Sequence, residues 1–269
     1  MSRLKILITG AGGFVGGFIA KNLVSSYEIL SPTSKELDLT NLVQVEQWFE
    51  KNEVDVVVHC ALSGREVLSS TDPKYLSDGL LMFRNLWLQK HHYARLVNLG
   101  TAYEFDLTKD NTNVLEYDFV QHLPKTSYGY AKNLTARIIR ETPSFYNLKL
   151  FGVFHETENL NRFFQRVKHQ DEIVINNDIY LDYIYLPDIL PMLELMITGR
   201  SQHCDVNMVY PNKYRLSEMA ELLCKHLGLP TAKIKIKNST GNNLTGDSIA
   251  LSSYKFDLIG LEQGLRNYK

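Results

Sequence analysis

A short, mostly apolar segment near the start of the chain runs directly into a glycine-rich turn, and this junction most constrains the fold. Residues 4–9 end at Gly10, and apolar side chains recur at helical spacing after Gly16. Glycine is needed where a strand turns sharply into a helix and where the backbone approaches a pyrophosphate closely. The first helical turn then offers N–H groups to phosphates. The junction predicts a dinucleotide site formed by Gly10, Gly12, Gly13, Phe14, Val15 and Gly16.

Predicted strands and helices alternate through the first 154 residues. Apolar runs predict strands, and helical spacing predicts the intervening helices. The strands are expected at 28–30, 54–60, 94–99 and 148–154, and the helices at 43–50, 75–91 and 125–140. Alternation of this kind is typical of a parallel sheet with helices on both faces. The sequence therefore predicts an α/β fold with a Rossmann-like, doubly wound parallel sheet.

The remaining chain has a looser pattern. Strands are expected within 173–185, and helices at 188–197 and 216–227, the last ended by Gly228. Residues 235–247 are rich in asparagine and glycine and are expected to form an exposed loop. At this chain length we expect one large domain with a smaller lobe. The predicted dinucleotide-binding core comprises 1–154, with 181–208 returning to it, and the predicted C-terminal substrate-binding lobe comprises 155–180 and 209–269.

Composition excludes several classes of function. The chain has 29 Lys and Arg against 30 Asp and Glu, and this balance argues against a dedicated nucleic-acid partner. Its three cysteines lack the spacing of metal ligands, so no metal is expected. No apolar run approaches the roughly 20 residues that span a bilayer, and the first residues do not resemble a secretory signal. We expect a soluble, cytoplasmic protein without a membrane partner.

The segment after the second predicted strand indicates which dinucleotide binds. An acidic side chain there would bind the ribose 2′-hydroxyl of NAD and repel the 2′-phosphate of NADP. This sequence instead places Ser34 and Lys35 after other hydroxyl groups. Asp38 and Leu39 lie further on, where an adenine edge could meet them. We therefore predict NADP(H) as the cofactor and keep NAD as the alternative.

Tyr128 and Lys132 are four residues apart on a predicted helix, so their side chains share one face. A lysine ammonium near a phenol lowers the tyrosine pKa, which would make Tyr128 an acid or base usable near neutral pH. Thr101, at the end of the preceding predicted strand, supplies a third group that can hydrogen-bond a substrate oxygen. The three residues form a candidate catalytic set.

These features together resemble a known family. They are the glycine motif, Asp38-Leu39-Thr40, Val58-His59-Cys60-Ala61, Thr101, the Tyr128 and Lys132 pair, and Asp182-Tyr183-Ile184-Tyr185-Leu186 with Asp188. The chain resembles the extended short-chain dehydrogenases/reductases that act on nucleotide sugars. That resemblance implies that Tyr128 gives a proton to the carbonyl oxygen, Lys132 holds the nicotinamide ribose, and Thr101 orients the substrate. It also implies that Cys60 and Ala61 contact the cofactor.

Details within the family narrow the expected reaction. The 4,6-dehydratases place an Asp-Glu pair after the threonine, whereas Ala102 and Tyr103 follow Thr101 here. GDP-fucose synthases resemble this chain at Leu99-Gly100 and at residues 35–40 but epimerise with a cysteine and a histidine. Tyr103 stands at the cysteine position, and no matching histidine lies near Leu160. What remains resembles the NADPH-dependent 4-ketoreductases of deoxysugars in surface-polysaccharide biosynthesis.

The resemblance also implies substrate contacts, although some family residues differ. Leu181 replaces the arginine that usually precedes Asp182 and often binds the diphosphate, and Lys149 replaces another family arginine. The candidates to bind the diphosphate in its place are Arg162, Arg166 and Arg215. Asn159 matches the segment that touches the diphosphate, and a helix N-cap is its other interpretation. The predicted substrate-binding residues are Tyr103, Asn159 and Arg162.

Two other functions remain open at this stage. The same residues would serve an NAD-dependent nucleotide-sugar 4-epimerase, which takes a hydride and returns it to the other face. A non-catalytic NAD(P)-sensing protein of the same fold is the third hypothesis, although a sensor has no use for a tuned tyrosine. Family resemblance also implies a homodimer formed through the helix at 125–140.

The choice of cofactor is testable at Lys35. If its ammonium contacts the 2′-phosphate, Lys35→Ala weakens NADPH binding while NADH binding stays unchanged. Titrating each cofactor into the parent and variant proteins measures both affinities. Tighter binding of NAD by the parent, with no loss of NADPH affinity in Lys35→Ala, would contradict the prediction.

Overall fold

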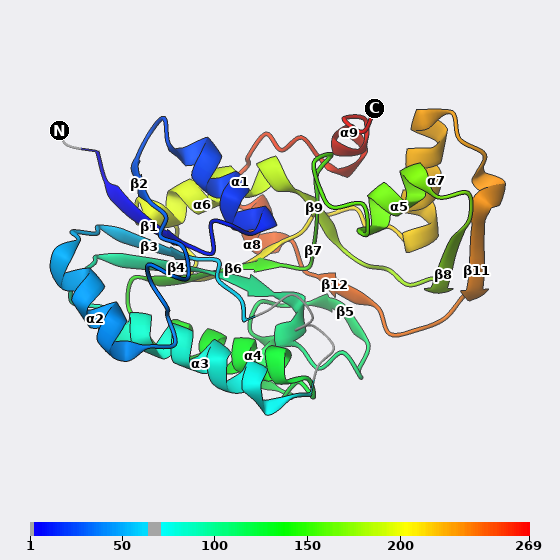
Figure 1. The fold of residues 1–269 in the computed structure, drawn as a ribbon. Coiled ribbons are helices and arrows are strands. Elements are labelled where there is room, and N and C mark those ends of the chain that lie inside the picture. Colours follow the sequence, from blue (N-terminus) through cyan, green and yellow to red (C-terminus); the bar gives the residue numbers. More distant parts are fainter. Residues whose placement is uncertain (1–2, 64–70) are drawn as a thin grey trace. The chain divides into compact units, whose positions relative to one another are not determined.

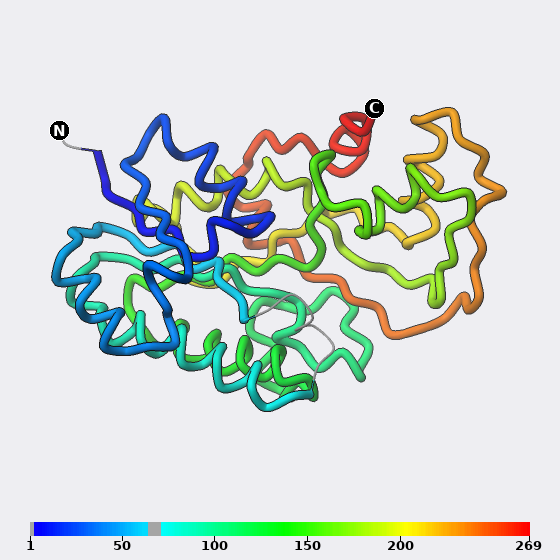
Figure 2. Tube along the Cα trace, in the orientation of Figure 1, coloured from blue at the N-terminus to red at the C-terminus, as the bar shows by residue number. Residues whose placement is uncertain are grey.

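The computed structural model describes residues 3–63 and 71–269, drawn as a ribbon in Figure 1 and as a tube in Figure 2. Contacts between residues group the chain into two compact units. The first unit comprises the described residues up to Asp106 together with Tyr117–Lys149 and Met192–Val206. The second comprises Leu107–Glu116, Leu150–Pro191 and Asn207–Lys269. The functional roles assigned to the two lobes stay predictions.

A six-stranded sheet in the order β10-β6-β4-β3-β1-β2 organises the first unit. Its strands are β1 (Lys5–Thr9), β2 (Glu28–Leu30), β3 (Val56–His59), β4 (Arg95–Thr101), β6 (Phe145–Leu150) and β10 (Asp205–Met208). β1 pairs in parallel with both β2 and β3, and β3 with β4. The connection after β1 leads to β2 on one side, whereas the later strands lie on the other. Ligands of such sheets bind at this switch point, outside the carboxyl ends of the strands.

Helices lie on both faces of this sheet, as Figure 1 shows. They are α1 (Phe14–Leu23), α2 (Leu42–Lys51), α3 (Pro73–Leu88), α4 (Ser127–Arg140) and α6 (Leu190–Ile197). All residues of β3 are buried, which a sheet covered on both faces requires. The main apolar cluster joins strand residues such as Leu7 and Val57 to Phe49 of α2 and Phe83 of α3. Each such side chain contributes roughly 1.5–3 kcal/mol to folding, so this packing fixes the strands that carry the site.

The second unit contains three two-stranded parallel pairs. They are β5 (Asn111–Val114) with β12 (Leu244–Gly246), β7 (Gly152–Phe154) with β9 (Tyr183–Tyr185), and β8 (Ile173–Asn177) with β11 (Ile234–Asn238). The helices of this unit are α5 (Phe163–His169), α7 (Leu216–Leu227), α8 (Ile249–Ser252) and α9 (Leu261–Leu265). Gly228 ends α7 at a φ of 67°, the left-handed conformation that glycine adopts without strain.

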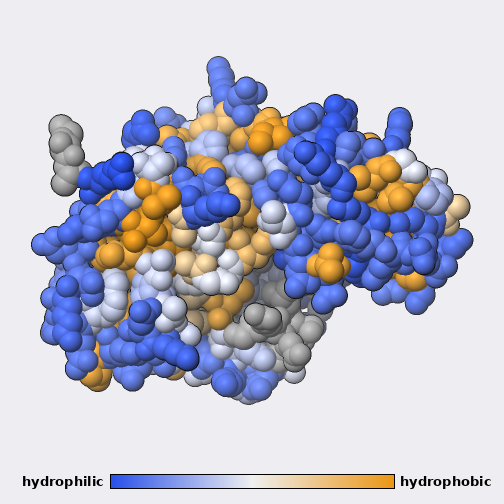
Figure 3. All heavy atoms as spheres, turned by 45° about the horizontal axis from the view of Figure 1, so that its top comes forward, coloured by the Kyte–Doolittle hydropathy of each residue, from blue (hydrophilic) through white to orange (hydrophobic). Residues whose placement is uncertain are grey.

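The described residues also form short 3-10 helices. They are η2 (Ala102–Glu104), η3 (Asp118–Val120), η4 (Leu186–Ile189) and η5 (Thr231–Lys233). No helix in the described ranges 3–63 and 71–269 is both long and apolar enough to cross a membrane. Hydrophilic side chains cover most of the face seen in Figure 3.

The structure corrects two predictions about secondary structure. Residues 235–247 are not one exposed loop, because they contain most of β11 and all of β12. Ile234 and Ile236 pair with Ile173 and Ile175 of β8, but the lysines between them and the following asparagines hide this alternation. The single strand expected at 148–154 is two strands, β6 and β7, which separate at Phe151.

The glycine turn between β1 and α1 is held in a conformation that a side chain would prevent. Gly10 has a φ of 71°, and a Cβ atom there would lie 2.7 Å from the Ala61 backbone. A Cβ on Gly16 would collide with the Gly10 carbonyl oxygen, whereas one on Gly12 would meet no atom within 4 Å. Gly10 and Gly16 are therefore required by the fold itself, and Gly12 is not.

This difference predicts how two similar substitutions behave. Gly10→Ala forces a β-carbon into the left-handed region and against the Ala61 backbone, so we expect it to lower the free energy of unfolding by about 1–3 kcal/mol. Gly12→Ala is the matched control, and we expect a change within about 0.5 kcal/mol. Urea titration followed by circular dichroism measures both. Equal stability of the two variants would contradict the account of the turn.

Candidate active site

Two neighbouring strand ends form the predicted cofactor side of the site. The glycine turn follows β1, and Cys60 and Ala61 follow β3, so the Gly10 backbone packs against Ala61. Gly13 is the N-cap of α1, and no side chain caps that helix. The open space at Gly12 lies in the same turn. A backbone turn that leads into an uncapped helix end fits the pyrophosphate of a dinucleotide.

His59, at the end of β3, is a buried neutral side chain. Its Nδ1 lies 2.8 Å from the Thr9 hydroxyl. Burial, together with the positive charge of Lys132, lowers the pKa of His59 to about 3. Burial also raises the pKa of Cys60 to about 12. Both groups are therefore uncharged near neutral pH and add no charge beneath a bound cofactor.

The segment predicted to select NADP is exposed in part. Ser34, Lys35 and Asp38 are exposed, whereas Leu39 is buried in the apolar cluster of the first unit. The Asp38 carboxylate accepts hydrogen bonds from the backbone and hydroxyl of Thr40, so it organises its own turn. Leu39 contributes packing, and its backbone oxygen accepts a hydrogen bond from Asn85. Lys35 and Ser34 are thus the exposed side chains of the predicted set that suit a 2′-phosphate.

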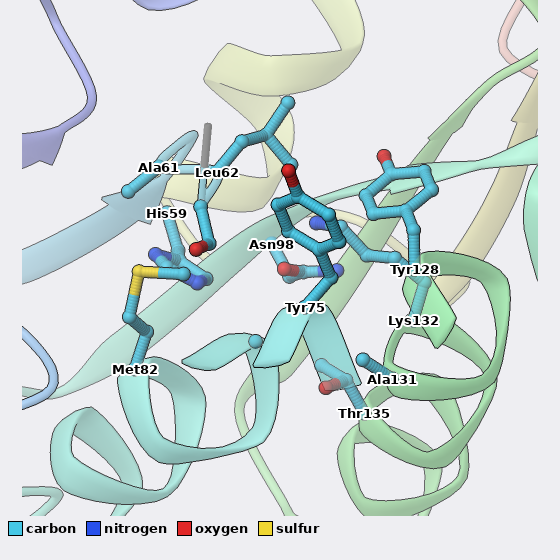
Figure 4. A pocket seen from close by; sticks show the side chains of 12 residues that line it. His59, Ala61, Leu62, Tyr75, Met82, Asn98, Tyr128, Ala131, Lys132 and Thr135 are labelled. Atoms are coloured by element: carbon cyan, nitrogen blue, oxygen red, sulfur yellow. The ribbon is translucent and has the colours of Figure 1, made fainter. Parts of the chain in front are cut away.

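Thr101, Tyr128 and Lys132 come together at the ends of β4 and α4. Each is 8% exposed. The Thr101 hydroxyl hydrogen-bonds the Tyr128 phenol, and the Lys132 ammonium donates a hydrogen bond of 2.8 Å to the Leu99 backbone oxygen. The start of α4 is fixed by Thr126, whose hydroxyl accepts from the Gly129 N–H. The structure therefore brings the predicted catalytic set into one place, as Figure 4 shows for Tyr128 and Lys132.

The protonation of this set differs from the expectation. Burial raises the pKa of Tyr128 well above 10, and the negative charge of Glu104 adds to the effect while the hydrogen bond from Thr101 opposes it. Burial lowers the pKa of Lys132, which Glu104 opposes. The structure does not show the expected lowering of the Tyr128 pKa, because burial raises that pKa and Lys132 is not among the groups that shift it. At neutral pH Tyr128 is a protonated phenol, suited to donate a proton rather than to remove one.

Other side chains line the same pocket without having been anticipated as site residues. Tyr75 of α3 and Asn98 of β4 lie beside Tyr128 and Lys132 (Figure 4). The Asn98 amide donates to Asn147, but its buried Oδ1 has no hydrogen-bond partner among the described residues. Tyr75 occupies an ordinary position of an amphipathic helix, so no sequence signal distinguishes it from a packing residue.

Tyr103 lies in the first unit next to the catalytic set. Its ring packs edge-on against the Tyr128 ring, with 5.7 Å between centroids. Tyr103 lies in η2, two residues after Thr101, and its N–H donates a hydrogen bond of 3.3 Å to the Thr101 hydroxyl. Of the predicted substrate contacts, it is the one in the same unit as Tyr128.

Asn159 and Arg162 belong to the second unit, where local contacts engage both side chains. Asn159 accepts from the Asn161 N–H at 2.9 Å and is not a helix N-cap, because Arg162 takes that position before α5. The Arg162 guanidinium bonds to Glu158 at 3.0 Å and to the Val153 backbone oxygen at 2.6 Å. Both contacts hold the chain around α5, so the positive charge of Arg162 already has partners within the second unit.

The other two arginines predicted as candidates for the diphosphate, Arg166 and Arg215, also have local partners, and so does Lys213, which the sequence analysis did not name. The Arg166 guanidinium donates a hydrogen bond of 3.3 Å to the Gln170 side chain. Arg215 donates to the Asp178 backbone oxygen at 2.6 Å. Lys213 pairs with Asp182 at 2.7 Å. Within residues 3–63 and 71–269, no group of three or more His, Cys, Asp and Glu side chains is arranged to hold a metal ion.

Comparisons with known proteins show what this chain is similar to. Two curated relatives match: GDP-L-colitose synthase of Yersinia pseudotuberculosis, 29% identical over 133 residues, and GDP-L-fucose synthase of Azorhizobium caulinodans, 38% identical over 103 residues. These matches cover 48% and 36% of this chain, and only 43% and 33% of the respective relatives. The chain thus matches less than half the length of either relative.

A solved structure with the same fold is the dTDP-4-dehydrorhamnose reductase of Bacillus anthracis in complex with NADP. It superimposes with a TM-score of 0.81 at 19% sequence identity, over 100% of this chain and 98% of that chain. At this identity the likeness shows a shared fold. It confirms the predicted Rossmann-like α/β architecture.

The sequence model for the NAD-dependent epimerase/dehydratase family matches residues 6–207. That range contains the glycine turn, Thr101, Tyr128 and Lys132, and it covers most of the chain. The resemblance inferred from these motifs is confirmed at the level of the family. The chain belongs to the NAD-dependent epimerase/dehydratase family.

Proposed function

We propose that this protein reduces the 4-keto group of a nucleotide-linked deoxysugar with NADPH, as a step in surface-polysaccharide biosynthesis. The observation that carries the proposal is the buried set of Thr101, Tyr128 and Lys132, in which the phenol is hydrogen-bonded to Thr101 and holds its proton at neutral pH. A carbonyl that gains a hydride needs a proton donor of this kind.

The cofactor assignment rests on the turn and on the segment after β2. The backbone of Gly10–Gly16 would hold the pyrophosphate, Ser34 and Lys35 the 2′-phosphate, and Cys60, Ala61 and Lys132 the nicotinamide half. NADPH, when bound, supplies a hydride to the substrate carbon. NAD stays the alternative cofactor. Because NAD lacks the 2′-phosphate, the exposed Lys35 would not strengthen its binding.

The side chains then account for the rest of the reaction. Thr101 orients the carbonyl oxygen, and Tyr128 donates its phenolic proton to that oxygen as the hydride reaches carbon. The carbonyl becomes a hydroxyl, and the resulting phenolate regains a proton from solvent. Lys132 stabilises the transient phenolate by its positive charge. The hydroxyl of Thr101 already bonds to the phenol, so little rearrangement is needed to place the donor.

The raised Tyr128 pKa favours reduction over 4-epimerisation. An epimerase of this family must first remove a proton from the sugar hydroxyl, which needs the phenolate form. Burial and Glu104 both disfavour that form here. The non-catalytic hypothesis is disfavoured because a sensor gains nothing from a buried threonine, tyrosine and lysine set.

The substrate class comes from the relatives, whose names specify GDP-L-colitose and GDP-L-fucose synthesis, and from the fold shared with a dTDP-sugar reductase. We propose that Tyr103, which packs against Tyr128, contacts the nucleotide sugar. We also propose that the protein is a cytoplasmic homodimer. A thermal-shift panel of CDP-, GDP-, UDP- and dTDP-sugars with NADPH tests the base, because a tightly bound ligand stabilises the folded state.

The mechanism is tested by Tyr128→Phe, which keeps the ring and removes only the hydroxyl. We expect folding and NADPH affinity to survive and the reduction rate to fall roughly 10²–10⁴-fold, the usual contribution of a positioned general acid. Because the folded-state pKa of Tyr128 is raised, the parent rate should persist above the pH at which an ordinary phenol ionises. Stopped-flow loss of reduced-nicotinamide absorbance measures these rates.

Tyr130→Phe is the matched control, since it makes the same change two residues along α4. It should keep the parent rate. Lys132→Ala should lower both the rate and the cofactor affinity. A Tyr128→Phe protein that reduces the ketosugar at the parent rate would remove Tyr128 from the mechanism.

A further inference from the structure

A buried carboxylate lies directly behind the catalytic threonine. Glu104 ends η2, three residues after Thr101, and its residue exposure is 0%. Its Oε1 accepts a hydrogen bond of 2.9 Å from the Thr101 N–H. The Thr101 hydroxyl in turn accepts from the Tyr103 N–H, so the turn is closed from both ends. This capping arrangement fixes the Thr101 backbone.

Glu104 is also tied to the helix that carries the other two catalytic residues. Its backbone oxygen accepts a hydrogen bond of 2.7 Å from Asn133, which follows Lys132 on α4. The same Asn133 amide donates to the Phe119 backbone oxygen at 2.8 Å. Asn133 thus joins α4, which carries Tyr128 and Lys132, to η2, the short helix that directly follows Thr101.

The negative charge of Glu104 is only partly balanced. Lys149 of β6 lies 3.3 Å from Glu104 and 3.2 Å from Asp205 of β10. Burial alone would lower the pKa of Lys149, but the two carboxylates more than offset burial and raise it. The Asn147 amide adds hydrogen bonds of 3.1 and 3.3 Å to the Glu104 carboxylate. Glu104 and Asp205 thus share the Lys149 ammonium.

We infer that Glu104 is a positioning residue of the proposed reductase, whose buried carboxylate fixes the turn that carries Thr101 and sets a negative potential behind Tyr128 and Lys132. The inference rests on the proposed function for its catalytic meaning. It does not rest on that function for the geometry, which consists of hydrogen bonds and ion pairs within one unit of the chain.

The charge of Glu104 has a defined consequence for protonation. It disfavours the Tyr128 phenolate and favours the Lys132 ammonium, so its negative charge acts to raise the pKa of both groups. Among the described residues, Lys149 of β6 and Asp205 of β10 are the charged side chains of this ion-pair group, whereas His59 of β3 is neutral. Glu104 therefore helps to keep Tyr128 protonated, and the proposed reduction consumes this proton.

Two substitutions separate the hydrogen bond from the charge. Glu104→Gln keeps an oxygen acceptor for the Thr101 N–H and removes the charge. Glu104→Asp keeps the charge and withdraws the carboxylate by one methylene. The matched control is Asp205→Asn, which removes the other carboxylate beside Lys149 on a strand two places from β4.

The charge is read out at Lys132, with no substrate required. Lysine side chains labelled with ¹³C are titrated by NMR, and the Lys132 signal is assigned by its loss in Lys132→Ala. We expect a lower Lys132 pKa in Glu104→Gln than in the parent, with a much smaller change in Asp205→Asn. An unchanged Lys132 titration in folded Glu104→Gln would overturn the electrostatic part of the inference, whether or not any ketosugar is reduced.

The positioning part is read out in the reaction. For Glu104→Asp we expect kcat to fall roughly tenfold or more, as for other small misplacements of a reacting group, while KM and the alkaline limb of the pH profile stay unchanged. For Glu104→Gln that limb should move to lower pH. A parent kcat in Glu104→Asp would overturn the positioning part, and this test stands even where Glu104→Gln does not fold.

Discussion

The site depends on the carboxyl ends of neighbouring parallel strands meeting at one edge of a sheet. β1 ends in the glycine turn, β3 ends at Cys60 and Ala61, and β4 ends at Thr101. The turn after β1 packs so closely on the Ala61 backbone that only glycine fits at position 10. The same edge receives α4, and with it Tyr128 and Lys132.

Burial then decides what this arrangement can do chemically. A lysine beside a tyrosine suggests a phenolate when the two are considered alone. In the folded chain burial and the negative charge of Glu104 raise the pKa of Tyr128, and the phenol keeps its proton. Glu104 and Lys149 extend the buried charges under the site. A buried pair of this kind costs desolvation energy that an apolar pair would not, which is consistent with a role other than stability.

The sequence was a good guide to elements with strong periodicity and to residues that act through spacing. The buried valines of β3, the helix at Leu216–Leu227 and the Tyr128 and Lys132 pair were predictable because one local pattern defines each. β11 was missed because lysines and asparagines interrupt its short alternation. Local patterns also could not reveal partners distant in the chain, such as Glu104 with Lys149 or Arg162 with the Val153 carbonyl. The burial of Leu39 was likewise not predictable from a local pattern, because its packing partners come together only in the folded sheet.

The central claim is that the protein transfers a hydride to a sugar carbonyl and adds a proton from Tyr128. The most direct measurement follows deuterium from C4-deuterated NADPH into a nucleotide 4-ketosugar by NMR. The account predicts one deuterium at C4 of the product sugar, one new hydroxyl and one oxidised cofactor for each turnover. A reduced sugar whose C4 carries no deuterium, or a 4-ketosugar left unreduced with NADPH bound, would contradict it.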